Sequence, residues 1–86
     1  MHRGWVASPH YRAVINALKA ARLSAGISQR QLAQRLGKHP SFINKIELIE
    51  RRIDVLEFIA VAKAMGVAPT VLLERMTEAL PDHFEI

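Results

Sequence analysis

The chain has 86 residues with a hydrophobic share of 50% and no cysteine, so we expect a single domain that buries its own core. The lack of cysteine excludes a disulfide framework and a thiolate metal site, and it is compatible with a reducing compartment. No apolar run has the length of a membrane span, and the N-terminal stretch MHRGWVASPHY lacks the apolar segment of a signal peptide. These features predict a cytoplasmic protein that is not associated with a membrane.

The net charge of +4 is divided unevenly along the chain. Residues 1–46 contain eight Lys and Arg and no acid, which gives +8, whereas residues 47–86 contain four Lys and Arg and eight acids, which gives −4. An asymmetry of this kind suggests that one side of the molecule faces a polyanion. The alternative is a solvated face that happens to be rich in basic residues.

Two helices are expected in the basic half. Ser8 followed by Pro9 is typical of a helix start and Gly26 of a helix end, which predicts a helix over about 9–25. The pattern SQRQ at residues 28–31 is a capping box, and Gly37 ends the segment after two turns. The second helix is therefore predicted over about 29–36.

Three more helices are expected in the rest of the chain. Pro40 suits the first turn of a helix over about 40–48. Asp54, with Glu57 three residues later, predicts a capped helix over about 54–65, and Pro69 opens a last helix over about 69–79. The fold class is all-α, a compact five-helix bundle, with a flexible segment at 1–7, a domain at 8–80 and a tail at 81–86.

Two short helices joined by a turn with glycine, in SQRQLAQRLGKHPSFINKIE, form a helix-turn-helix pattern. Residues from about 8 to 76 resemble the lambda-repressor-like helix-turn-helix domains, the Cro or xenobiotic-response-element (XRE) family. The resemblance is carried by the order and spacing of the Leu, Ala, Ile and Glu residues in that stretch and by AKAMGV later in the chain. The resemblance implies a transcription regulator, expected to be a repressor, that binds double-stranded DNA as a homodimer. It implies no cofactor and no metal.

The resemblance also implies which residues contact DNA. The helix at 40–48 should enter the major groove, where side chains at its N-terminal end meet base edges and lysine favours guanine acceptors. The residue that opens the helix at 29–36 should contact a phosphate, aided by the helix dipole. The expected base-reading residues are Ser41, Asn44 and Lys45, and the expected phosphate-side residues are Gln29, Arg30, Lys38, His39, Pro40, Arg51 and Arg52. The alternative for each is an ordinary solvated position.

Arg22 and Glu47 fall on faces that otherwise read as apolar. In the domains that this sequence resembles, an Arg of the first helix and the Glu that ends the third form a partly buried ion pair. The resemblance therefore assigns these two residues a structural role.

The sequence departs from the family at Ile49, where a Gly is usual. A β-branched residue at positive φ is strained, so we expect a rebuilt turn with Ile49 in an ordinary conformation rather than a longer helix. Large apolar side chains where solvent is expected often mark a contact surface. The predicted dimer or partner surface consists of Leu48, Ile49, Val71, Met76, Leu80 and Phe84, although Leu48 and Ile49 could instead cover the core.

An enzyme is not expected, because the four His residues are scattered and no nucleophile has a base at a suitable position. Arg3 and Trp5 could form an arm that reaches DNA or a flap over the first helix, and a frayed terminus is the alternative. The competing function is an antitoxin or another protein-interaction module, which would hold its partner through Leu48, Ile49 and the last helix.

Overall fold

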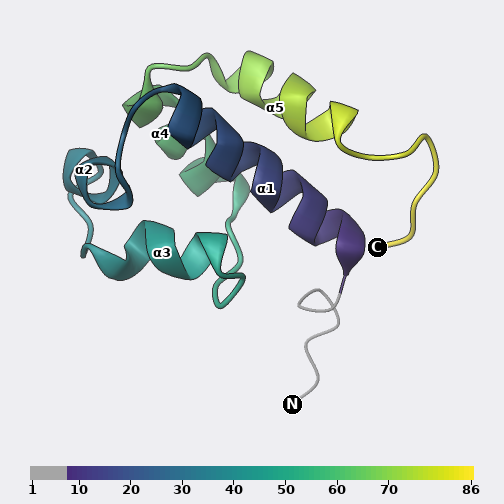
Figure 1. Ribbon diagram of the computed structural model, residues 1–86, viewed down its shortest axis with the longest axis horizontal. Coiled ribbons are helices and arrows are strands. Elements are labelled where there is room, and N and C mark those ends of the chain that lie inside the picture. The colour runs from purple at the N-terminus through teal and green to yellow at the C-terminus, as the bar shows by residue number, and fades with distance from the viewer. Residues whose placement is uncertain (1–7) are drawn as a thin grey trace.

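The computed structural model describes residues 8–86 and forms five α-helices in that range, α1 (Pro9–Ser24), α2 (Gln29–Arg35), α3 (Ser41–Glu47), α4 (Val55–Met65) and α5 (Pro69–Glu78) (Figure 1). The all-α class is confirmed, and each boundary lies within one residue of the expected one. The segment at 1–7, with Arg3 and Trp5, lies outside the described residues.

Side-chain caps begin three of the helices. Ser8 accepts a hydrogen bond from the Tyr11 amide at 3.2 Å, and both expected capping boxes, Ser28 with Gln31 and Asp54 with Glu57, are present. Each cap satisfies amide donors that have no partner inside the helix. The N-termini of α1, α2 and α4 therefore follow from local sequence.

Four helices end in the same hydrogen-bonded turn, the Schellman motif, in which a residue at the end of the helix adopts a left-handed conformation. In three of them this residue is Gly26, Gly37 or Gly66, with φ of 71°, 66° and 77°. At the end of α3 it is Ile49, with φ of 61°. The Ile49 amide donates to the Ile46 carbonyl at 3.0 Å, and the next amide, of Glu50, donates to the Lys45 carbonyl at 2.9 Å.

The expectation that Ile49 adopts an ordinary conformation is therefore wrong. Its side chain is 4% exposed and belongs to the core. Burial of an isoleucine side chain contributes about 1.5–3 kcal/mol, which exceeds the cost of about 1–2 kcal/mol for a left-handed L-residue. Packing thus holds this turn in the conformation that glycine adopts elsewhere in the chain.

The core lies between α1 and the other four helices. α1 crosses the middle of the molecule with α5 along one side and the α2–α3 pair along the other (Figure 1), and it packs against both α3 and α5. The most deeply buried large side chains come from all five helices: Ile15, Leu32, Ile46, Val61 and Leu72. The core therefore holds α2 and α3 in a fixed orientation.

Among residues 8–86, no single helix is long and apolar enough to cross a membrane. α4 and α5 meet that test of length and composition only when taken together, and they are bent by 109° at the break between them.

Candidate nucleic-acid interface

α3 presents a mixed polar face away from the core. Ile43 and Ile46 are buried, whereas Ser41 and Asn44 are half-buried and Lys45 is exposed. At about 100° per residue, positions 41, 44 and 45 lie on one side of the helix. The three residues expected to read bases therefore share one face.

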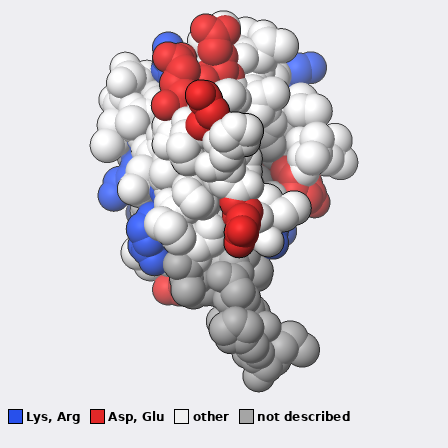
Figure 2. Space-filling view, turned by 90° about the vertical axis from the view of Figure 1, so that its right-hand side faces the viewer, with Lys and Arg blue, Asp and Glu red and all other residues white. Residues whose placement is uncertain are grey.

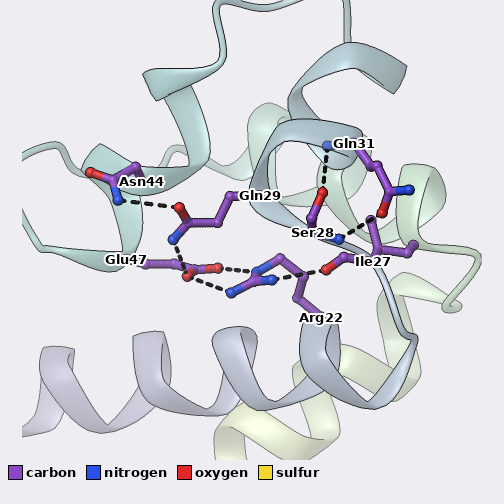
Figure 3. Close-up of polar contacts among 7 residues, drawn as sticks. All are labelled: Arg22, Ile27, Ser28, Gln29, Gln31, Asn44 and Glu47. Carbon is purple, nitrogen blue, oxygen red and sulfur yellow. Dashed lines mark hydrogen bonds and ion pairs between the residues drawn. The ribbon is translucent and has the colours of Figure 1, made fainter.

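A buried ion pair joins this helix to α1. The Nε and Nη2 atoms of Arg22 donate to the two carboxylate oxygens of Glu47 at 2.6 and 3.0 Å, and Nη1 donates to the Ile27 carbonyl at 2.8 Å (Figure 3). The side chains are 7% and 4% exposed. Arg22 and Glu47 thus form the pair that the resemblance implies, and the two nitrogen atoms bind the two carboxylate oxygens in the two-pronged arrangement that arginine and carboxylate favour.

The hydrogen bonds continue from the ion pair toward the outer face of α3. Gln29 Nε2 donates to Glu47 Oε1 at 2.8 Å, and Gln29 Oε1 accepts from Asn44 Nδ2 at 3.2 Å (Figure 3). Gln29 therefore links the buried pair to a base-reading candidate. The sequence did not reveal this link, because Gln29 and Asn44 are 15 positions apart and meet only in the folded unit.

The turn between α2 and α3 places His39 at the start of α3. Its Nδ1 lies 3.1 Å from the Ser41 amide nitrogen, from which it accepts a hydrogen bond, and 2.8 Å from Ser41 Oγ. α3 has no side-chain cap from Pro40, its N-cap residue, so the imidazole supplies an acceptor for one of its first amides. Pro40 precedes the helix and is not part of its first turn, which corrects the expected start by one residue.

Four expected phosphate-side cations differ in how tightly they are held. Arg30 and Lys38 are exposed, and the Lys38 ammonium lies 5.6 Å from the centre of the Phe42 ring. Arg52 is also exposed and lies over the Tyr11 ring at 5.4 Å. Arg51 instead packs over the Phe42 ring at 4.8 Å.

Arg51 is engaged within the fold. Its Nη1 and Nη2 donate to the carboxylate of Glu57 at 2.8 and 2.5 Å, and Nη1 also reaches the Arg52 carbonyl at 3.1 Å. The hydrogen bonds from Arg51 lower the pKa of Glu57 to about 2, and the same bonds raise the pKa of Arg51. The guanidinium therefore ties the loop after α3 to the start of α4, which weakens its assignment to a phosphate.

Figure 2 looks at the end of the molecule that carries the C-terminal tail, and it shows acidic side chains gathered at the top of this face, with others lower down. The α2–α3 segment, residues 28–46, contains Arg30, Arg35, Lys38 and Lys45 and no acid. Arg35 donates to the Ala64 carbonyl at 2.8 Å and so also joins α2 to α4.

The predicted dimer or partner surface is only partly exposed. Ile49 and Met76 are buried, at 4% and 8% exposure. Ile49 therefore covers the core, which was the alternative for this residue, whereas Met76 is a core residue that also lines a groove between α1, α4 and α5. Leu80 is half-buried, and the remaining three, Leu48, Val71 and Phe84, are exposed. Phe84 in the tail lies 5.6 Å from the His10 ring, measured between ring centres.

A second apolar surface lies on α4 and α5. A groove of about 440 Å³ runs between α1, α4 and α5 and is lined almost entirely by apolar side chains, among them Phe58, Ile59 and Leu73. Val55 and Leu56 are exposed at 76% and 77%. The side of α4 that faces the core instead carries Val61, Ala62 and Met65. On an almost wholly apolar helix, periodicity alone does not identify the buried face.

Comparisons with known proteins agree with this geometry. The family model described as Helix-turn-helix matches residues 18–72, a range that contains all of α2, α3 and α4. A solved structure described as an XRE-family like protein from Pseudomonas syringae pv. tomato str. DC3000 is 42% identical, with a TM-score of 0.75, over 84% of this chain and 88% of that one. No curated protein matches the chain.

Proposed function

The chain belongs to the XRE family of helix-turn-helix proteins and is a DNA-binding transcription regulator in general terms; on this premise we propose that it is a sequence-specific repressor that binds duplex DNA as a homodimer. In this proposal α3 enters the major groove and its polar outer face reads base edges. The basic side chains around α2 and the following turn contact phosphates.

The observation that carries the proposal is the hydrogen-bonded path from the buried Arg22–Glu47 pair through Gln29 to Asn44. A base contact gives specificity only if the side chain that makes it is held in place. Here the amide of Asn44 is held by its hydrogen bond to Gln29, which in turn is bonded to the buried Glu47. The exposed Lys45 beside it offers a donor for guanine acceptors. Asn44 itself suits adenine.

The apolar surface on α4 and α5 supports a homodimer. Large contiguous apolar patches are uncommon on monomers, and this one combines the groove with the exposed Val55, Leu56 and Leu73. It lies on α4 and α5, outside the α2–α3 unit, so it would remain available while α3 is bound. Occupation of an operator by such a dimer excludes other proteins from that site, which is why we expect repression.

The proposal is tested by selection of binding sites from a randomised duplex pool with the purified chain, followed by titration of a recovered site. We expect two half-sites about 34 Å apart and a log affinity that falls with log salt by about 0.9 for each phosphate contacted. Lys45→Ala should weaken the recovered site by about 1–3 kcal/mol. Arg75→Ala, which removes one exposed cation from α5, is the matched control and should have little effect.

Equal affinity for every duplex, or a salt-independent interaction, would overturn sequence-specific binding. Sedimentation of the free chain and of its complex tests the dimer, and a single copy on a single half-site would contradict it. A reporter placed behind the recovered site tests the direction of regulation, and higher expression in the presence of the protein would rule out repression.

A further inference from the structure

Leu48 stands out on the outer face of α3. Its side chain is 58% exposed, and it lies seven residues after Ser41, which is about 20° short of two full turns. Leu48 therefore shares the face of Ser41, Asn44 and Lys45. Within residues 29–48, all of which the structure describes, it is the one large apolar side chain that is exposed.

Neither the core nor the turn accounts for a leucine at this position. Leu48 is the C-cap residue of α3, with φ of −82° and ψ of −1°, an ordinary helical conformation that most residues adopt. The buried side chain of the turn is that of Ile49. A polar residue at position 48 would satisfy the same backbone and would expose less apolar surface.

Leu48 is also separate from the apolar side chains on α5. α3 packs against α2 and α1, and Figure 1 shows α3 and α5 on opposite sides of α1. The nearest residues on the outer face of α3 are polar, Asn44 and Lys45. The earlier assignment of Leu48 to the same partner surface as the C-terminal residues is therefore not supported by its position.

The major groove contains one prominent apolar group at base edges, the 5-methyl group of thymine. The same methyl group occurs on 5-methylcytosine. Residues three apart on a helix have Cβ atoms about 5–6 Å from each other, a separation that spans one or two base-pair steps of about 3.4 Å. Leu48 and Lys45 can therefore contact neighbouring base pairs.

On the basis of the proposed function, we propose that Leu48 is a specificity-determining residue that packs against the 5-methyl group of a pyrimidine next to the base pair read by Lys45. Lys45 selects the guanine acceptors, and Leu48 selects the methylated pyrimidine beside them. Together they would require a guanine and a methyl-bearing pyrimidine within one or two steps of each other in each half-site.

The test uses the full chain and a recovered operator in which each thymine is replaced in turn by deoxyuridine, which removes only the methyl group and keeps base pairing. At one thymine per half-site we expect affinity to fall about fourfold, the effect of one methyl group leaving an apolar contact. Leu48→Ala should weaken the unmodified operator by at least that factor, and deoxyuridine at the same position should then cause no further loss.

The matched control is Leu23→Ala, which truncates a leucine on α1 with a similar exposure of 59% and should leave both the affinity and the deoxyuridine effect unchanged. If no thymine responds, each cytosine is replaced in turn by 5-methylcytosine. Tighter binding at one position by the unmodified protein, but not by Leu48→Ala, would show that Leu48 contacts the methyl group of 5-methylcytosine. The deoxyuridine arm needs no variant, so it does not depend on the folding of Leu48→Ala.

The proposal is overturned if no pyrimidine methyl group affects binding, or if Leu48→Ala retains the same response to its removal. These results are distinct from failure of the proposed function, which would appear as the absence of any selected site or as no effect of Lys45→Ala. A protein that selects a site, needs Lys45 and ignores every methyl group would keep its function and lose this role for Leu48.

Discussion

Arg51 and Glu57 form a two-pronged ion pair across the loop between α3 and α4, with nitrogen to oxygen distances of 2.8 and 2.5 Å. The pair joins the turn that carries the left-handed Ile49 to the N-terminal cap of α4, because Glu57 Oε1 also accepts from the Asp54 amide at 3.1 Å. The arginine that follows α3 thus has a position fixed by an acid of α4.

This pair predicts a loss of stability in acid. The pKa of Glu57 is lowered from 4.5 to about 2 in the folded chain, so its contribution to the free energy of unfolding is complete above pH 4.5 and is lost as the pH falls toward 2. Solvent reaches both side chains, at 39% and 20% exposure, so we expect Glu57→Gln to cost only about 0.5–1 kcal/mol at pH 7. Urea unfolding at pH 7 and pH 3 checks this. The free energy of unfolding of the variant should differ less from that of the unmodified chain at pH 3 than at pH 7, and an equal difference at the two pH values would contradict the prediction.

Removal of the buried acid should have a much larger effect. Glu47→Ala leaves the Arg22 guanidinium buried without its carboxylate, which costs on the order of 3–5 kcal/mol. Glu50→Ala removes an exposed acid from the turn just after α3 and should change stability by less than about 0.5 kcal/mol. Thermal unfolding of both variants provides the comparison, and similar melting temperatures would show that the buried pair does not stabilise the fold.

Two substitutions of Ile49 separate the cost of its backbone conformation from the benefit of its burial. Both Ile49→Ala and Ile49→Gly remove a buried side chain and should destabilise the chain by about 2–5 kcal/mol. Glycine relieves the left-handed strain, so Ile49→Gly should be the more stable of the two by about 0.5–1 kcal/mol, the reverse of their order inside a helix. Equilibrium unfolding measures the free energy of unfolding of both variants. If Ile49→Ala is the more stable of the two, the turn carries no strain.

Gln29 is expected to affect which sequence is bound as well as how tightly. Its Oε1 accepts from Asn44, so Gln29→Ala should release the Asn44 amide and relax selection at the base pair that Asn44 reads. Site selection with the variant measures this, with Gln31→Ala as a control, since the hydrogen bonds of Gln31 go to Ser28 in the capping box of α2. A selected site identical to that of the unmodified chain would leave Gln29 with a phosphate role alone.

The salt dependence of binding should distinguish Arg51 from a freely exposed arginine. Because its guanidinium is held by Glu57, Arg51→Ala should leave the slope of log affinity against log salt nearly unchanged. Arg30→Ala removes an exposed cation at the start of α2 and should reduce the slope by about 0.9 per contact. Equal reductions for the two variants would mean that Arg51 exchanges Glu57 for a phosphate when DNA is bound.

The starts of α2 and α4 were predictable from residues close together in the chain. Ser28 with Gln31 and Asp54 with Glu57 are three residues apart, and a cap needs only that spacing to act. The roles of Gln29 and Arg51 were not predictable, because each depends on a partner chosen by packing: Gln29 bonds to Glu47 and Asn44, and Arg51 bonds to Glu57 in preference to remaining open to phosphate.

The sequence by itself determined the helices, their order and the polar face of α3, because capping residues, glycines and helical periodicity act over one or two turns. The tertiary structure decided which apolar side chains are buried: it covered Ile49 and Met76 and left Val55 and Leu56 exposed. It also placed a β-branched residue in a left-handed turn, since only contacts with distant helices supply enough burial to offset that strain. Local rules therefore specified where α3 ends, and packing from outside the segment specified how it ends.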